Sequence, residues 1–107
     1  MIKLQTYTAD TITLDVDSND FKILDKNSLW YGNTLYELYS KASTPWEWHE
    51  QIMQKAKDLN LLCMSTPFDE SSVDFLEELK VPAYKIASFE NNHINLIEKA
   101  RKKYDKI

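Results

Sequence analysis

Short strand-like segments alternate with helical patterns along this chain, and this order limits the folds that it can adopt. Residues 2–6, 61–66 and 83–87 have the length and composition of strands, and stretches with helical spacing separate them. Strands joined through helices run parallel, with right-handed crossovers. The sequence therefore predicts an α/β fold on a parallel sheet, either a doubly wound sheet or part of a (β/α)₈ barrel.

The chain's only glycine bears on the choice between these two folds. Gly32 predicts a turn, and the sequence contains neither a G-x-G-x-x-G nor a G-x-x-x-x-G-K-[ST] phosphate loop. Without such loops, an anionic ligand must be held by side chains at strand ends, as in (β/α)₈ barrels. The sequence therefore favours part of a barrel.

Two helices are expected before the second strand. The first covers residues 35–42. Thr44, Pro45 and Glu47 form the start signal of the second, as N-cap, first helical residue and capping-box partner. The buried face of this second helix is predicted to consist of Trp48, Ile52, Ala56 and Leu59.

Two more helices follow the later strands. Pro67 ends the second strand, and Asp69 is expected to cap the next helix. Asn91 or Asn92 is expected to cap the final helix. The inward residues of these two helices are predicted to be Val73, Leu76 and Leu79 in the first and Ile97, Ala100 and Tyr104 in the second.

Composition excludes several classes of function. A net charge of −4 gives no general electrostatic case for nucleic acid, and residues 101–103 are expected to be a solvated basic helix end. Cys63, the single cysteine, excludes an internal disulfide and a cysteine-built zinc site, and it suits a reducing cytoplasm. No apolar stretch is long enough to span a membrane.

The stretch 84–90 is the strongest candidate for a functional site. Lys85 is predicted to lie in a buried strand, where a lysine needs an anionic partner, and Ser88 and Glu90 follow just past the strand's end. Ligands of α/β proteins bind at such strand ends. The alternatives are that Lys85 extends to solvent and that Ser88 and Glu90 only cap the last helix.

Other chemistry-bearing side chains are given structural roles. His49 and His93 are too far apart in the pattern to form a metal pair, and each is expected to be a surface or loop residue. Trp46 and Trp48 are expected to pack rather than to stack on a ligand, and Cys63 is expected to fill apolar space.

Three motifs in order, residues 3–7, 65–69 and 82–90, resemble the sialic acid synthase family, whose members condense phosphoenolpyruvate with an acylamino sugar. Residues 29–39 and 44–49 look most like the pseudaminic acid synthase branch of that family. In one departure, Trp30 stands where sialic acid synthases place a sugar-binding asparagine, which argues against N-acetylmannosamine as the acceptor.

The resemblance covers essentially the whole chain and implies its place in a larger fold. Residues 1–107 would be a fragment of the N-terminal TIM-barrel catalytic domain, about strands 2 to 4 with their helices and the start of strand 5. The family's C-terminal antifreeze-like domain would be absent. For the parent protein the family also implies a homodimer, which in the family depends on the C-terminal domain, whereas the expectations of a cytoplasmic location and of no nucleic-acid or membrane partner come from the composition given above.

The resemblance also implies a role for individual residues. Lys3, Lys85 and Glu90 would be catalytic, with both lysines on phosphoenolpyruvate and Glu90 on the sugar near its reacting carbon. The remaining substrate contacts would be Gln5, on the sugar, and Thr66 and Ser88, on phosphoenolpyruvate. A divalent cation, Mn²⁺ or Mg²⁺, would be held by histidines that are not in this chain.

The predicted activity is that of a pseudaminic acid synthase, which joins phosphoenolpyruvate to a 2,4-diacetamido-2,4,6-trideoxy hexose. Two alternatives remain at this point. The parent enzyme would make another nonulosonic acid, including N-acetylneuraminate, or the 107-residue chain would be catalytically inactive and would only bind anions or associate with another chain.

Overall fold

The computed structural model describes residues 1–103, which form two compact units. One unit holds Met1–Tyr7 together with the described residues from Thr44 onward. The other unit holds Thr8–Ser43. All of the site residues predicted from the sequence lie in the first unit.

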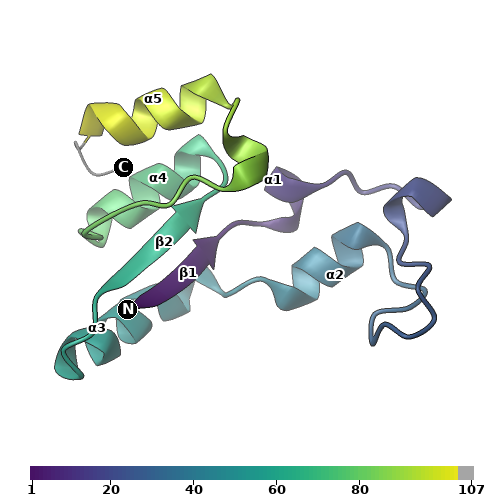
Figure 1. Cartoon of the computed structure of the whole chain (residues 1–107), viewed down its shortest axis with the longest axis horizontal. Coiled ribbons are helices and arrows are strands. Elements are labelled where there is room, and N and C mark those ends of the chain that lie inside the picture. Colours follow the sequence, from purple (N-terminus) through teal and green to yellow (C-terminus); the bar gives the residue numbers. More distant parts are fainter. Residues whose placement is uncertain (104–107) are drawn as a thin grey trace. The chain divides into compact units, whose positions relative to one another are not determined.

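The first unit is built on parallel strands. Strands β1 (Ile2–Thr6) and β2 (Cys63–Pro67) pair in parallel and lie side by side in Figure 1. Ser65 of β2 also forms a parallel bridge with Tyr84, and the Lys85 N–H donates to the Ser65 carbonyl oxygen at 3.0 Å. The prediction of a parallel α/β arrangement is confirmed, and the arrangement is compatible with part of a barrel.

The third predicted strand, over 83–87, is wrong in extent. Tyr84 forms an isolated bridge, and a 3₁₀ turn, η3 (Ser88–Glu90), begins soon afterwards. In this register the next ladder bond would need an N–H at position 67, and Pro67 has none. The proline that ends β2 therefore also stops pairing on this side.

The second strand begins two residues later than the predicted start at residue 61. The preceding helix, α3 (His49–Asp58), ends with Asn60 in the left-handed region at φ 56°. The Leu61 N–H then donates back to the Ala56 carbonyl at 2.8 Å, as in a Schellman-type helix end. This bond keeps Leu61 with the helix end, and β2 starts only at Cys63.

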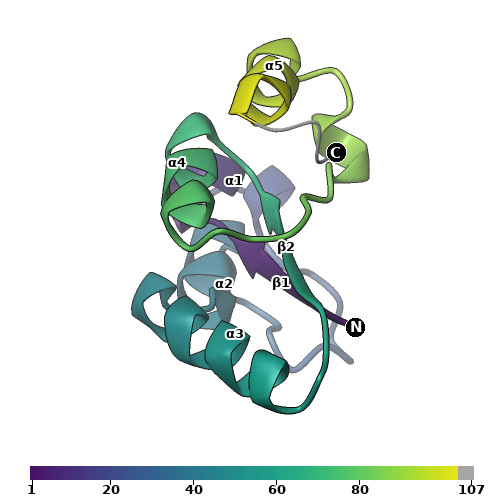
Figure 2. The ribbon, with the colours of Figure 1, turned by 90° about the vertical axis from the view of Figure 1, so that its left-hand side faces the viewer.

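Two helices cover one face of the strands. Figure 2 shows α3 and α4 (Glu70–Glu78) on the same side of β1 and β2. Asp69 caps α4 as predicted, with its carboxylate accepting from the backbone N–H groups of Ser71 and Ser72. The core of this unit is Val73, Leu76, Val81, Tyr84, Leu96 and Ala100.

The predicted start and buried face of α3 are wrong in part. A 3₁₀ turn, η2 (Trp46–Trp48), comes first, so α3 begins at His49 rather than just after Thr44. This delay rotates the inward face, because the 3₁₀ turn is wound more tightly than an α-helix. Trp48, the last residue of the 3₁₀ turn, is 56% exposed. Leu59, which follows the last residue of α3, is 57% exposed, whereas Ala56 is buried as predicted.

Helix α5 (Ile94–Lys103) packs against α4 and is seen beside it in both overall views (Figures 1 and 2). It begins after His93, whose carbonyl accepts from the Ile97 N–H at 3.1 Å, so neither Asn91 nor Asn92 is the residue before the helix. Ala100 is buried as predicted, and so is Leu96. Tyr104 and the predicted start of a further strand lie outside the described residues.

The second unit contains α1 (Ala9–Ile12), η1 (Asn19–Phe21) and α2 (Leu35–Ala42), so the predicted helix over 35–42 is confirmed. Thr34 and Glu37 form a capping box at the start of α2. Gly32 adopts φ +84°, which favours glycine, and the predicted turn is confirmed. Across residues 1–103, no helix has both the length and the apolar character needed to cross a membrane.

Candidate functional site

The face of the strands opposite α3 and α4 carries most of the predicted site residues. In the parallel register Gln5 lies opposite Thr66, and Lys3 lies two residues earlier on the same face of β1. Tyr84 pairs with Ser65, which places Lys85 next to Thr66 on that face. Residues from three chain segments thus meet on one surface, defined here as the open face: Lys3, Gln5, Thr66 and Lys85.

Burial differs sharply across the open face. Thr66 is 2% exposed, because its strand has β1 on one side and the Tyr84–Lys85 segment on the other. Lys3, Gln5 and Lys85 are exposed. The prediction that Lys85 lies in a buried strand is therefore wrong, since α3 and α4 cover only the opposite face.

Ser88 and Glu90 belong to η3, which follows the Tyr84–Lys85 segment. Ser88 is exposed, and the Glu90 side chain is 22% exposed with Oε2 3.3 Å from Nδ1 of His93. His93 lies just before α5, as predicted for a loop residue. Glu90 is therefore oriented by a neighbouring imidazole, which no sequence argument had anticipated.

A line of buried polar side chains lies behind the open face, on the helix side of the strands. Thr6 Oγ1 is 2.8 Å from His49 Nε2 and 2.7 Å from Ser65 Oγ. His49 Nδ1 is 3.2 Å from the Pro45 carbonyl oxygen. Thr6, His49 and Ser65 are all 0% exposed, so the prediction of a surface or loop position for His49 is wrong.

The partners fix the direction of every bond in this line. A carbonyl oxygen can only accept, so His49 Nδ1 carries the proton and Nε2 accepts from the Thr6 hydroxyl. Thr6 Oγ1 is then the acceptor for the Ser65 hydroxyl. Burial lowers the pKa of His49, although backbone hydrogen bonds at Pro45 and Trp46 act in the other direction, and the lowered pKa favours this neutral form.

One sequence signal could have found the buried histidine. His49 and Ala56 are seven residues apart, which puts them on the same side of a helix, and Met53 between them packs against the core. The residues around His49 also pack as aromatic neighbours. Trp46 stacks on Phe75 with ring centroids 4.8 Å apart, and the His49 ring meets the edge of Phe75 at 5.4 Å. The packing role predicted for Trp46 is confirmed.

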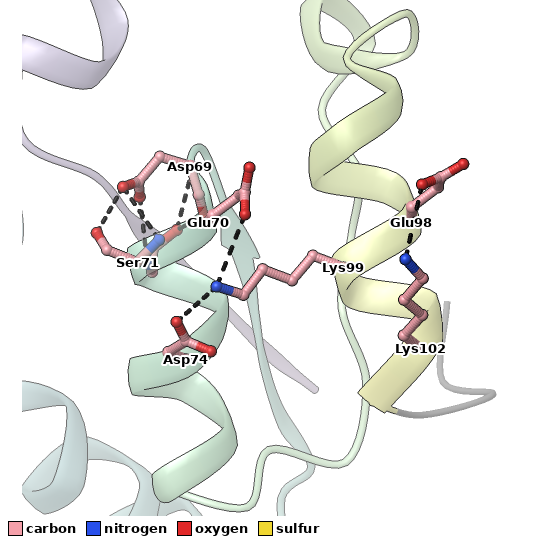
Figure 3. A network of polar contacts seen from close by, with 8 residues as sticks. Asp69, Glu70, Ser71, Asp74, Glu98, Lys99 and Lys102 are labelled. Atoms are coloured by element: carbon pink, nitrogen blue, oxygen red, sulfur yellow. Dashed lines mark hydrogen bonds and ion pairs between the residues drawn. The ribbon is translucent and has the colours of Figure 1, made fainter.

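The remaining charged cluster joins α4 to α5. Figure 3 shows Lys99 extending from α5 to Asp74, at 2.6 Å, and to Glu70, at 3.8 Å, with Lys102 beside Glu98. The hydrogen bond to Asp74 raises the pKa of Lys99. Lys99 therefore connects α5 to α4, whereas Lys102 pairs with Glu98 within α5.

An open groove of about 690 Å³ lies at the other end of the strands, where α3 and α4 end. Its lining includes Leu61, Leu62, Cys63 and Pro82, and none of the site residues predicted from the sequence. Burial raises the pKa of the Cys63 thiol, which keeps it protonated and unreactive, in line with its predicted role as apolar filler. The groove is therefore separate from the open face.

The described residues do not form a complete set of metal ligands. Among residues 1–103, no group of three or more histidine, cysteine, aspartate or glutamate side chains is arranged to hold a metal ion. The divalent cation implied by the sequence resemblance therefore stays a prediction.

Comparison with known proteins adds the last observation. The sequence matches the model of the NeuB family over residues 1–107. It is 49% identical over 104 residues to a pseudaminic acid synthase of Campylobacter jejuni and 48% identical over 99 residues to one of Helicobacter pylori, covering 94% and 92% of this chain. An N,N'-diacetyllegionaminic acid synthase of Legionella pneumophila is 33% identical over 98 residues, which cover 91% of this chain. The matched region is 30%, 28% and 27% of these relatives' own lengths.

Proposed function

Because the chain belongs to the NeuB family, we propose that the protein acts as a pseudaminic acid synthase. The reaction joins phosphoenolpyruvate to a 2,4-diacetamido-2,4,6-trideoxy hexose and yields a nine-carbon nonulosonic acid and phosphate. The choice of sugar rests on the difference in sequence identity between the chain and its relatives. Two pseudaminic acid synthases are 48–49% identical to the chain, whereas the legionaminic acid synthase is 33% identical.

The proposed fold of the catalytic domain is a (β/α)₈ barrel, of which this chain supplies about strands 2 to 4. The parallel pair of strands, the third segment beside β2 and the helices on one face support this assignment. A complete barrel takes about 250 residues. The open face would then point into the barrel, and the ends of β1 and β2 would lie at its catalytic rim.

The open face suits the donor substrate in charge and in hydrogen bonding. Phosphoenolpyruvate carries a phosphate and a carboxylate, and Lys3 and Lys85 are the cations on that face. Lysine binds phosphate as a compact charge, while hydroxyl groups fix its orientation. Thr66 and Ser88 supply such hydroxyls, and Gln5, opposite Thr66, would contact the sugar.

The proposed chemistry forms one carbon–carbon bond and breaks one carbon–oxygen bond. The methylene carbon of phosphoenolpyruvate attacks the aldehyde carbon of the open-chain sugar, and the aldehyde oxygen gains a proton. Water adds to the cationic carbon that remains and gives up one proton. The new hydroxyl then loses its proton as the bond between that carbon and the phosphate oxygen breaks, which leaves a ketone and releases inorganic phosphate. Glu90 would orient a sugar hydroxyl or transfer the proton, with His93 at 3.3 Å orienting its carboxylate.

A second candidate is a synthase for another nonulosonic acid, which the 33% identity to a legionaminic acid synthase favours. A third is a chain that binds anions or associates with another polypeptide without catalysis. The homodimer and the divalent cation stay predictions.

The test assays the protein at its natural full length for phosphate release with phosphoenolpyruvate, Mn²⁺ and each candidate sugar. We expect turnover with the 2,4-diacetamido-2,4,6-trideoxy hexose. Preferred turnover of N-acetylmannosamine would refute the choice of sugar. Phosphate release from none of the sugars would favour the non-catalytic candidate.

Lys85→Met gives a sharper test of the open face. A hydrogen bond to a charged group contributes about 1.5–3 kcal/mol, so the KM for phosphoenolpyruvate is expected to rise by roughly 10- to 100-fold. Lys57→Met, at an exposed lysine of α3, is the matched control and should leave the KM unchanged. Equal effects of the two substitutions would argue against a substrate contact at Lys85.

A further inference from the structure

Two members of the buried line of Thr6, His49 and Ser65 are sequence neighbours of residues on the open face. Thr6 follows Gln5 in β1, and Ser65 precedes Thr66 in β2. The Ser65 carbonyl also accepts from the Lys85 N–H at 3.0 Å. Neighbouring residues of a strand project to opposite faces, so a side chain held on the helix side fixes its neighbour on the open face.

The hydrogen bonds of the buried line allow few other arrangements of its three side chains. His49 donates to the Pro45 carbonyl and accepts from Thr6, and Thr6 accepts in turn from Ser65. All three side chains are fully buried, so no water replaces a lost partner at low cost. A fully satisfied buried network of this kind makes the local structure rigid and specifies one arrangement.

We propose that His49 is a positioning residue of the active site, which acts through Thr6 and Ser65 to hold Gln5, Thr66 and Lys85 in register on the open face. The inference rests on the proposed function, because it assigns a purpose to the position of those three residues. Packing alone does not require this histidine, since an apolar side chain of similar size would fill the space beside Phe75. Its Nε2 instead joins α3 to Thr6 of β1, and Thr6 in turn bonds Ser65 of β2, while Nδ1 bonds the Pro45 carbonyl before the turn.

The test compares two substitutions, each of which keeps the position of one ring nitrogen of His49 and loses the other. In His49→Gln the amide oxygen reaches the place of Nε2 and still accepts from Thr6, whereas His49→Asn reaches only the place of Nδ1 and loses that bond. Ala56→Gly is the matched control. Ala56 lies on the same helix, seven residues from His49, and is 1% exposed, and glycine at this position weakens α3.

Kinetic constants are measured on the protein at its natural full length, alongside urea midpoints. We expect His49→Asn to lower kcat/KM by about 10- to 100-fold, with a raised KM for phosphoenolpyruvate, since misplacement by about 1 Å has effects of this size. His49→Gln should stay within about 3-fold of the wild type. Ala56→Gly should lower the urea midpoint and leave both constants unchanged.

The outcomes separate positioning from simple stabilisation. If His49→Asn lowers only the urea midpoint, as Ala56→Gly does, the positioning role is refuted while the proposed function stands. A wild-type protein that condenses none of the sugars refutes the proposed function and this inference with it. Should His49→Asn fail to fold, Thr6→Val and Thr6→Ser replace the pair, with loss expected only in the variant without a hydroxyl.

Discussion

The effect of the N-cap residue Asp69 on stability can be predicted quantitatively from the structure. It lies two residues after the end of β2, and its carboxylate accepts from the Ser72 N–H at 3.0 Å and the Ser71 N–H at 3.2 Å. Ser72 completes a capping box with its own hydroxyl. Substituting Asp69 with alanine removes the partners of two backbone donors at the start of α4 and the charge that complements the helix dipole.

The loss expected for Asp69→Ala is about 1–2 kcal/mol in the free energy of unfolding, the upper part of the usual range for an N-cap. For a chain of this size each 1 kcal/mol lowers Tm by about 4–8 °C. Asp69→Asn keeps an acceptor oxygen and should lose clearly less. The assay is urea unfolding followed by circular dichroism, with Glu78→Ala, an exposed residue at the other end of α4, as the matched control.

The same residue predicts how stability changes with acid. Burial raises the pKa of Asp69, but hydrogen bonds from Ser71 and Ser72 outweigh it and hold the pKa below its usual value. A carboxyl group with a lowered folded-state pKa adds stability above its unfolded pKa of about 3.9, and that stability is lost as the pH falls through the folded pKa. Asp69→Asn should remove this part of the acid dependence. Equal stability losses in Asp69→Ala and Glu78→Ala would refute the argument.

Three further predictions concern the same unit. Burial lowers the pKa of His49, so its contribution to stability should be complete above pH 6.5 and should decline as the pH falls below 6.5. Urea midpoints between pH 5 and 8 would measure this decline, which His49→Gln should not show. Leu76→Ala, at 0% exposure, should lower the unfolding free energy by about 2–5 kcal/mol, whereas Leu62→Ala, at 67%, should change it by less than about 0.5 kcal/mol in the same experiment. Lys99→Met should lower Tm at low ionic strength, and the difference from wild type should shrink in 1 M salt, because the ion pair with Asp74 is partly exposed.

The sequence was sufficient to predict the elements with strong local signals. The parallel strands, the helix over 35–42, the cap at Asp69 and the turn at Gly32 all agree with the structure. Each depends on hydrophobic spacing or on a residue with a single conformational role. The family resemblance quoted from the strand ends agrees with the match to the NeuB family over residues 1–107.

The error at the start of α3 arose where a distant contact overrides a local signal. Thr44, Pro45 and Glu47 have the pattern of a helix start, but the Trp46 indole N–H donates to the Tyr7 carbonyl at 3.2 Å and Trp46 stacks on Phe75. These contacts accompany a 3₁₀ turn over 46–48 and shift the helix start to residue 49. With this later start, the buried face of the helix includes His49, which lies in the core.

The strands themselves explain why the buried histidine matters to the proposed site. β1 and β2 read Ile-Lys-Leu-Gln-Thr and Cys-Met-Ser-Thr-Pro, so both carry polar side chains on both faces. Such strands gain less from apolar burial than the near-continuous hydrophobic strands usual in parallel sheets. Their register must then depend more on specific bonds, and the Thr6–His49–Ser65 line supplies these on the helix side. The polar residues left on the other face are thereby free to meet a ligand.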